Sequence, residues 1–137
     1  MIKLVALLKG SPHLSRNEVI DYYERHHAPL ICSIIQDILE YRRSYLSEAI
    51  DGRDILTELL FADYASYERA MAAASTAEAA KRIGDDEARF LDRSATKLIL
   101  ADERRELSPH ACRLGDDVGR LQIGRCDHTP MSTARAS

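Results

Sequence analysis

Short apolar runs and helix-start signatures follow one another in a regular order through most of this chain, and that order leaves few folds open. Residues 2–8 (IKLVALL) are rich in branched aliphatic side chains and precede a Gly-Ser-Pro turn signal, so they predict a short buried strand. Later segments that are bounded by turn residues or alternate in polarity are further strand candidates: residues 38–47, 55–62 and 94–100. A turn is expected at residues 51–54.

The first helix is predicted to begin at Ser15. Ser15 and Glu18 form an S-x-x-E signature, in which the hydroxyl and the carboxylate each accept a hydrogen bond from a free backbone amide. Apolar residues then recur at spacings close to three and four, as on the buried side of a helix: Val19, Ile20, Tyr23, Leu30, Ile31, Ile34 and Ile35. Pro29 lacks an amide hydrogen and disfavours helical angles in the residue before it, so a kink or a restart is expected near His27.

A second helical region is predicted after the third strand candidate. The alanine-rich residues 64–74 favour a helix by propensity. Ser75 and Glu78 repeat the S-x-x-E signature before a further helical piece that reaches about residue 91. Gly84 lies inside that piece and predicts a break in it.

The predicted order of elements is β-α-β-β-α-β, which is typical of an α+β, ferredoxin-like domain. Such a domain has a four-stranded antiparallel sheet with helices on one face only. Because strands two, three and four carry apolar residues on both alternating sets, the other face of the sheet also needs cover. The sheet of a second copy would supply that cover, so a homodimer is predicted.

Length and charge exclude several classes of protein. The 137 residues suffice for one domain with a real core but not for two. The net charge of −3 arises from 19 basic and 22 acidic residues scattered along the chain, so no basic face is available for nucleic acid. The apolar residues 2–8 are far shorter than the ~20 residues of a membrane span, and neither a signal peptide nor a membrane anchor is predicted.

The cysteines indicate a reducing compartment. Cys32, Cys112 and Cys126 are odd in number and lack the paired spacing of a zinc site or a disulfide framework. A cytoplasmic location is therefore the simplest interpretation. A bridge or a shared metal between Cys112 and Cys126 stays open as a minor alternative.

Residues 104–137 differ in character from the periodic segments before them. They are charged and then rich in Ser, Thr, Ala and Arg, so residues 1–103 are predicted to form the domain and residues 104–137 a C-terminal extension. Residues 118–123 could add a short strand or an arm across the dimer, and residues 128–137 are expected to be disordered.

The most distinctive chemistry lies in residues 19–30, which hold two tyrosines and two histidines. At helical spacing Tyr23 and His27 share one face, whereas Tyr22 and His26 share the adjacent face. A histidine among apolar groups can accept or release a proton near neutral pH, as general acid–base catalysis requires. The competing interpretation is that His27 packs in the core and binds a carbonyl that the following proline leaves unpaired.

Other polar residues give weaker signals. Glu58, in an apolar strand, is a candidate buried base or, preferably, an outward-facing side chain. The acidic runs at residues 85–87 and 102–103 are interpreted as a solvated helix start and a strand end rather than as metal sites. The sequence contains no HExxH, phosphate-binding glycine loop or G-x-S-x-G elbow, so no metal, nucleotide or serine-hydrolase site is predicted.

The sequence resembles the EthD family over residues 1–103. The resemblance is carried by the opening MIKLVALLK, by the tyrosine pair that ends at Tyr23, and by the H-A-P-L motif that starts at His27. A weaker match is the T-E-L motif that starts at Thr57, with an aromatic and an acidic residue after it. The sequence departs from the family pattern at Tyr23, where many relatives have tryptophan, at His26, and in its long C-terminal extension.

The resemblance implies a dimeric α+β barrel with a cavity between the sheet and the first helix. It also implies a role in aromatic degradation or polyketide pathways, where such proteins accompany oxygenases or act without a cofactor as dehydratases, cyclases, isomerases or decarboxylases. On this basis His27 is expected to face the cavity as the catalytic acid/base, and no cofactor is expected. The expected substrate-binding residues are Tyr23, His26, Arg43 and Tyr45.

Each of these residues has an expected role in binding a small hydrophobic molecule. Tyr23 would orient His27 or bind a substrate oxygen, and His26 would reshape the pocket. Arg43 or Tyr45 would polarise a carbonyl or an enolate from the side of the sheet.

Two other functions stay open at this point. A non-catalytic protein could carry or sense the same hydrophobic molecule beside an oxygenase. A haem-binding barrel is the less favoured alternative, in which His26 or His27 would ligate iron.

Overall fold

The computed structural model describes residues 1–106 of the protein. In chain order its elements are β1 (Ile2–Leu8), α1 (Arg16–Tyr22), the π-helical turn η1 (Tyr23–His27), α2 (Ala28–Ile34), β2 (Glu40–Ile50), β3 (Arg53–Phe61), α3 (Tyr64–Ala74), α4 (Ala77–Phe90), the 3-10 turn η2 (Arg93–Ala95) and β4 (Lys97–Asp102). The expected arm at residues 118–123, the expected disorder at the end and the pairing of Cys112 with Cys126 concern residues 107–137, which lie outside the described residues.

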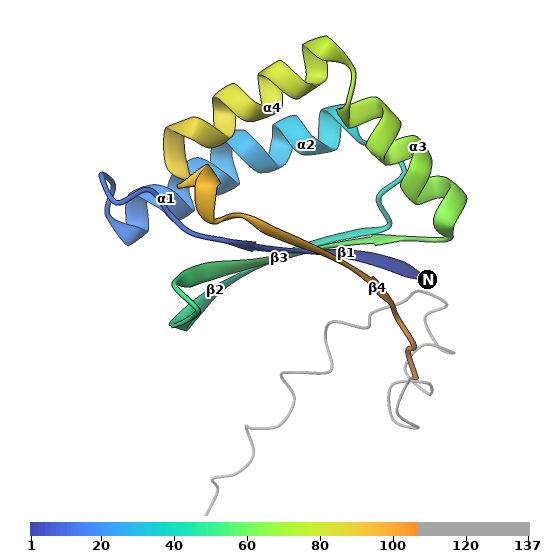
Figure 1. The fold of residues 1–137 in the computed structure, drawn as a ribbon, viewed down its shortest axis with the longest axis horizontal. Helices are drawn as coiled ribbons and strands as arrows, with labels where there is room; N and C mark the ends of the chain where they lie inside the picture. Colours follow the sequence, from blue (N-terminus) through green and yellow to red (C-terminus); the bar gives the residue numbers. More distant parts are fainter. Residues whose placement is uncertain (107–137) are drawn as a thin grey trace, which may run out of the picture. The chain divides into compact units, whose positions relative to one another are not determined.

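The strands form an antiparallel sheet in the order β2-β3-β1-β4. The helices α1, α2, α3 and α4 all lie on one face of this sheet (Figure 1). The element order is β-α-β-β-α-β, with each helical region divided in two. The α+β, ferredoxin-like fold predicted from the sequence is therefore confirmed.

β2 and β3 form a hairpin with a two-residue turn at Asp51 and Gly52. Both turn residues have positive φ angles, 53° at Asp51 and 81° at Gly52, as a type I′ turn requires. Aspartate and glycine are among the residues that adopt such angles most readily. The turn therefore needs only two of the four residues predicted for it, and β2 continues to Ile50 instead of ending at residue 47.

The first helical segment begins where the sequence predicts, but it continues past Pro29 without a break. Ser15 is the N-cap of α1: its hydroxyl accepts a hydrogen bond from Glu18 N–H, and the Glu18 carboxylate accepts one from Ser15 N–H. η1 follows directly, and its bond from Ala28 N–H to Tyr23 O spans one residue more than an α-helical bond. Ala28, the residue before Pro29, keeps helical angles (φ −62°, ψ −43°), so the irregularity expected near His27 takes the form of this π turn and not of a restart.

The second helical region departs from prediction in two respects. Thr76, not Ser75, is the N-cap of α4, because the Thr76 hydroxyl accepts from Ala79 N–H while Ser75 ends α3. Gly84 causes no break, since α4 continues through it to Phe90. A glycine costs a helix only about 1 kcal/mol, and the burial of Ala79 and Phe90 on the same helix outweighs that cost.

β4 begins at Lys97, later than the predicted residue 94. The residues before it form η2, whose N-cap Asp92 accepts hydrogen bonds from the backbone amide and the hydroxyl of Ser94. This local hydrogen bonding competes with the extended conformation that a strand requires.

The core lies between the sheet and the helices. Alternate residues of β1 and β3 face the helices and are buried, among them Leu4 and Leu8 on β1 and Ile55 and Phe61 on β3. Phe90 of α4 is buried in the same cluster as Leu8 and Ile55. Side chains that the first and last helices direct toward the sheet are therefore held in place at this core.

The opposite face of the sheet holds polar as well as apolar side chains. Lys3 Nζ lies 2.9 Å from Glu58 Oε2 and 3.2 Å from Glu103 Oε2. Glu58 thus points away from the helices, which is the orientation preferred from the sequence. Among residues 1–106, none of the helices has the length and apolar character that a membrane span needs.

Candidate functional site

A cavity of about 290 Å³ lies between the sheet and the helical layer. Its walls are mostly aliphatic side chains from both layers, such as Leu4, Ile31 and Leu98. Several polar groups also reach it: Tyr23, His27, Tyr41, Thr57, Glu87, Arg93 and Thr96. A mainly apolar cavity with a few convergent polar groups is the usual form of a small-molecule site.

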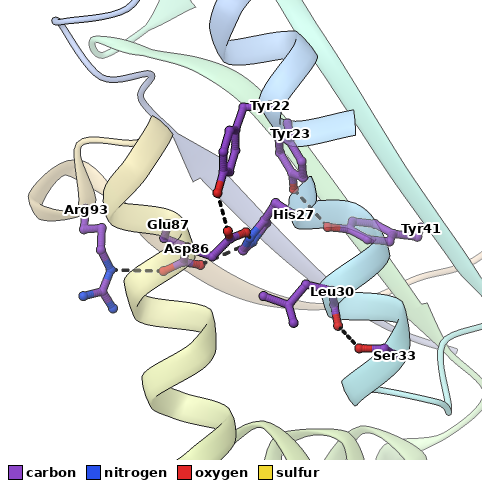
Figure 2. Close-up of polar contacts among 9 residues, drawn as sticks. All are labelled: Tyr22, Tyr23, His27, Leu30, Ser33, Tyr41, Asp86, Glu87 and Arg93. Atoms are coloured by element: carbon purple, nitrogen blue, oxygen red, sulfur yellow. Dashed lines mark hydrogen bonds and ion pairs between the residues drawn. The ribbon is translucent and has the colours of Figure 1, made fainter. Parts of the chain in front are cut away.

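His27 is buried in the cavity wall, and a carboxylate fixes its ring. Its Nδ1 lies 2.8 Å from Asp86 Oδ2, and the Tyr22 hydroxyl donates to Asp86 Oδ1 at 2.5 Å (Figure 2). A carboxylate accepts in both of these bonds, which assigns the proton of a neutral imidazole to Nδ1. Nε2 is then the nitrogen that can accept a proton, and within residues 1–106 it makes no hydrogen bond.

Glu87 and Arg93 lie beside Nε2 of His27. Glu87 Oε2 is 3.8 Å from Nε2, too far for a hydrogen bond but close enough to stabilise the positive charge of the ring when Nε2 is protonated. Arg93 Nε donates to Glu87 Oε1 at 3.1 Å, and the arginine side chain is 56% exposed. This ion pair therefore connects the cavity wall at His27 with solvent.

Aromatic packing holds the His27 ring in place. Its centroid lies 5.0 Å from that of Phe90 and 5.4 Å from that of Tyr23. Phe90 is completely buried. Two aromatic neighbours and the bond to Asp86 restrain the ring together, so Nδ1 and Nε2 cannot exchange places without breaking several contacts.

Three hydroxyls meet at the cavity wall beside His27 (Figure 2 shows two of them). The Tyr23 hydroxyl lies 2.7 Å from Thr57 Oγ1 and 3.2 Å from the Tyr41 hydroxyl. Burial raises the pKa of Tyr23 and that of Tyr41, so both phenols stay protonated at neutral pH. We call Tyr23, Thr57 and Tyr41 the hydroxyl triad.

Arg43 and Tyr45 are directed to a different carboxylate, that of Glu24. Arg43 donates to both Glu24 oxygens at 2.7 and 2.9 Å, and the Tyr45 hydroxyl donates to Glu24 Oε2 at 2.5 Å. The hydrogen bonds from Arg43 are the main cause that lowers the pKa of Glu24. The Arg43 guanidinium also lies 4.6 Å from the centre of the Tyr41 ring, so it touches one member of the hydroxyl triad.

Of the five site residues expected from the sequence, His27 and Tyr23 line the cavity together. Arg43 and Tyr45 are not among its lining residues. His26 is exposed, and its ring packs against a neighbouring tyrosine with the centroids 4.7 Å apart. A direct contact of these three side chains with a substrate stays a prediction.

The expectation that residues 85–87 form a solvated helix start is wrong, because they lie in the second half of α4. Asp85 is exposed, but Asp86 turns inward to bond His27. A signal for this was present in the sequence. Asp86 comes three residues after Ile83 and four before Phe90, so it falls on the apolar stripe of the helix.

Thr57 and Tyr41 carry no motif that marks them in the sequence. They become neighbours through the pairing of β2 with β3, which places Arg43 opposite Thr57 and Tyr41 opposite Leu59.

The interpretation that His27 binds a carbonyl freed by the nearby proline is also wrong. Its Nδ1 bonds to a carboxylate, and no side-chain bond caps the start of α2.

The polar groups of the cavity suit proton transfer better than metal binding. Within residues 1–106 there is no group of three or more His, Cys, Asp or Glu side chains that could hold a metal ion. The cavity instead presents one imidazole, several hydroxyls and one ion pair. Such a set can bind a ligand by hydrogen bonds and move a proton.

Fold and cavity together define a class of protein: a ferredoxin-like α+β domain with a ligand-sized cavity between its sheet and its helices. The model of the EthD domain matches residues 11–94. The chain belongs to the EthD family, as the motif at His27 implied. Among curated proteins, none matches the chain.

Solved structures share the fold at low sequence identity. An EthD-family protein from Bacillus halodurans C-125 is 23% identical, with a TM-score of 0.56, and the match covers 76% of this chain and 99% of that one. A dimeric ferredoxin-like protein of unknown function from Bacteroides fragilis is 12% identical, with a TM-score of 0.52 and coverage of 74% and 95%. An antibiotic biosynthesis monooxygenase is 17% identical, with a TM-score of 0.50 and coverage of 77% and 100%.

Proposed function

We propose that the protein binds a small, mainly apolar molecule in the cavity and that His27 exchanges a proton with it. The observation that carries this proposal is the setting of the His27 ring. The ring is buried in the cavity wall, Asp86 holds Nδ1 at 2.8 Å, and Nε2 has no hydrogen-bond partner within the described residues. One nitrogen oriented by a carboxylate and the other left free is the arrangement of a general base.

The proposed step moves one proton. Nε2 accepts it from a C–H or O–H group of the ligand, the electron pair stays on the ligand, and positive charge appears on the imidazole. Asp86, bonded to Nδ1, and Glu87, 3.8 Å from Nε2, lie where they stabilise that charge. Return of the proton to another atom of the ligand completes an isomerisation. Its transfer to a hydroxyl group that leaves as water completes a dehydration, and attack of the carbanion on a second carbonyl carbon, whose oxygen takes the proton, completes a cyclisation. None of these steps needs a cofactor.

The size of the cavity favours a compact ligand. Its volume of about 290 Å³ lies near the lower end of small-molecule sites, which span about 300–1,000 Å³. The aliphatic walls suit an aromatic or ketide-like skeleton of one or two rings. The monooxygenase among the similar structures supports an oxygenase-type or oxygenase-associated role as a variant of this proposal.

A carrier or sensor that binds the same molecule without converting it is the second candidate. The observation that favours it is the lining of the cavity, which is aliphatic over most of its surface. Aliphatic walls bind a ligand by shape and take no part in a reaction. The two candidates differ only in what His27 does after the ligand is bound.

The test uses wild-type protein and the variant His27→Gln. Both should be screened by thermal shift against phenols, quinones, anthrones, lactones and haem, with mass spectrometry of every binder after incubation. Glutamine retains an amide N–H near Asp86 and removes the base. We expect a compound that raises the Tm of both proteins and that only the wild type converts.

Other outcomes of this screen are equally clear. Conversion by both proteins would exclude His27 as the acid/base. Binding by both with conversion by neither would favour the carrier or sensor. A Soret band after addition of haem, lost in the variant, would identify a haem-binding barrel.

We also propose that the protein is a cytoplasmic homodimer that pairs through the sheet face opposite the helices, with residues 104–137 as an extension of the domain. Ile99 on that face is 43% exposed. The dimeric protein of the same fold supports such pairing. Light scattering after gel filtration should give the mass of two chains, and the mass of one chain would contradict the dimer.

A further inference from the structure

The hydroxyl triad contains one more donor than its internal contacts use. The Tyr23 hydroxyl meets Thr57 Oγ1 at 2.7 Å and the Tyr41 hydroxyl at 3.2 Å. Each contact uses one hydrogen, so two contacts among three O–H groups leave one hydrogen without an acceptor, whichever way the bonds run. Within residues 1–106 no other group bonds to these hydroxyls.

This surplus donor faces the cavity. Tyr23 is 2% exposed, Thr57 is 3% exposed and Tyr41 is partly buried, and all three side chains line the cavity. A buried donor that lacks an acceptor costs about 1–3 kcal/mol. A ligand that brings an acceptor atom to this place therefore gains more than a ligand of the same shape without one.

We propose that the hydroxyl triad binds an oxygen atom of the ligand, which makes the ligand a carbonyl compound or a phenol with one or two rings. This inference rests on the proposed function of the cavity and makes it more specific. Tyr23 belongs to the triad and also packs against His27, with ring centroids 5.4 Å apart. One small ligand can therefore place its oxygen at the triad and a neighbouring atom at His27.

The triad also has a part in the proton transfer. When Nε2 of His27 removes a proton from the carbon next to a carbonyl, the C–H electron pair forms a C=C bond and the carbonyl π pair moves onto oxygen. The surplus hydroxyl then donates its hydrogen bond to an oxyanion, and this bond is stronger than the one it makes to the neutral carbonyl. The Arg43 guanidinium lies 4.6 Å from the Tyr41 ring centre and does not line the cavity, so it contacts the triad from outside.

The test compares 1-tetralone with tetralin, two compounds with the same bicyclic skeleton that differ by one carbonyl. An NMR titration of cavity-lining methyl groups, such as those of Leu8 and Ile31, measures both dissociation constants. We expect wild-type protein to bind 1-tetralone about tenfold more tightly, which is the effect of one hydrogen bond.

A triple variant removes every hydroxyl of the triad while it keeps the side-chain shapes: Tyr23→Phe, Tyr41→Phe and Thr57→Val. Because no polar group of the triad is left unpaired, we expect this variant to fold. It should bind tetralin as the wild type does and lose the preference for 1-tetralone. Tyr64→Phe is the matched control, since it removes the hydroxyl of an exposed tyrosine that does not line the cavity and should keep the preference.

The outcomes separate this inference from the proposal beneath it. Equal binding of both compounds by the wild type, or a preference that survives in the triple variant, would overturn the oxygen site and leave the cavity proposal intact. Binding of neither compound would overturn the cavity as a site for such molecules, and the oxygen site with it. If the triple variant does not fold, intermolecular NOEs in the wild type decide: contacts from the Thr57 methyl group to the protons beside the carbonyl of 1-tetralone support the oxygen site, and contacts to the far ring alone overturn it.

Discussion

The inner network, centred on Asp86 and His27, and the outer network, centred on Glu24 and Arg43, are built from the same kinds of group. In each, a carboxylate accepts a tyrosine hydroxyl at 2.5 Å and contacts a side-chain nitrogen at 2.8 Å or 2.7 Å. They differ in exposure, because the Asp86 side chain is 16% exposed and that of Glu24 is 39% exposed. Water therefore screens the outer network and competes for its hydrogen bonds.

Hydrogen-bond distances alone therefore do not show which of two polar networks contributes more to stability. Loss of the inner carboxylate leaves buried partners without an acceptor, whereas loss of the outer one exposes its partners to water, which replaces the lost bonds. The inner network should thus contribute more to stability although the two have similar geometry. Three pairs of measurements test this ranking.

The largest effect is expected for Asp86→Ala, which removes the acceptor for His27 and Tyr22. It should lower the free energy of unfolding by about 2–3 kcal/mol. The matched control is Asp85→Ala, which breaks only an exposed pair with Lys81 and should cost less than about 0.5 kcal/mol. Urea denaturation followed by circular dichroism measures both variants. Equal losses would remove the distinction between the buried and the exposed position.

An intermediate effect is expected for Tyr22→Phe compared with Tyr45→Phe. Burial, together with the hydrogen bond to Asp86, raises the pKa of Tyr22 to about 12, so its hydroxyl is a donor at all ordinary pH values. Its loss should cost about 1 kcal/mol, and loss of the Tyr45 hydroxyl less than about 0.5 kcal/mol. The same urea denaturation applies. A larger loss for Tyr45→Phe would reverse the ranking of the networks.

The smallest effect is the pH dependence of the outer network. The folded-state pKa of Glu24 is lowered, mainly by hydrogen bonds from Arg43, so the unfolded chain binds this proton more readily. Its contribution to stability is present above the ordinary glutamate pKa and is lost as the pH falls through the lower folded value. The difference in unfolding free energy between wild type and Glu24→Gln should shrink from pH 5 to pH 3, and a constant difference would show that Arg43 does not affect Glu24 in this way.

Much of the fold could be predicted because its signals are local. The capping pair Ser15 and Glu18 and the turn pair Asp51 and Gly52 act through neighbouring backbone groups, so each has nearly the same effect in any fold. The break predicted at Gly84 failed for the opposite reason. Helix α4 persists there because its burial against the core is a tertiary effect that propensity does not contain.

The candidate site likewise combines residues that a local pattern can pair with residues that only the tertiary structure brings together. His27 and Tyr23 stand four residues apart on one helical segment, and a local pattern is enough to pair them. Asp86 is 59 residues from His27, and Thr57 is 34 residues from Tyr23. Such partners are brought together by strand pairing and helix packing, which the sequence of one segment cannot reveal.

The π turn η1 has a consequence for comparing this chain with its relatives. A π turn holds one residue more than the α-helical turn it replaces. At about 100° per residue, Val19 and Ile31 would point about 120° apart on an unbroken α-helix, but with one residue absorbed the angle falls to about 20°. Both are in fact buried. A relative without this turn would bury the same face with one residue fewer between these two positions. A sequence alignment that places no deletion between Val19 and Ile31 would therefore pair every residue on one side of the turn with the wrong neighbour, one position away.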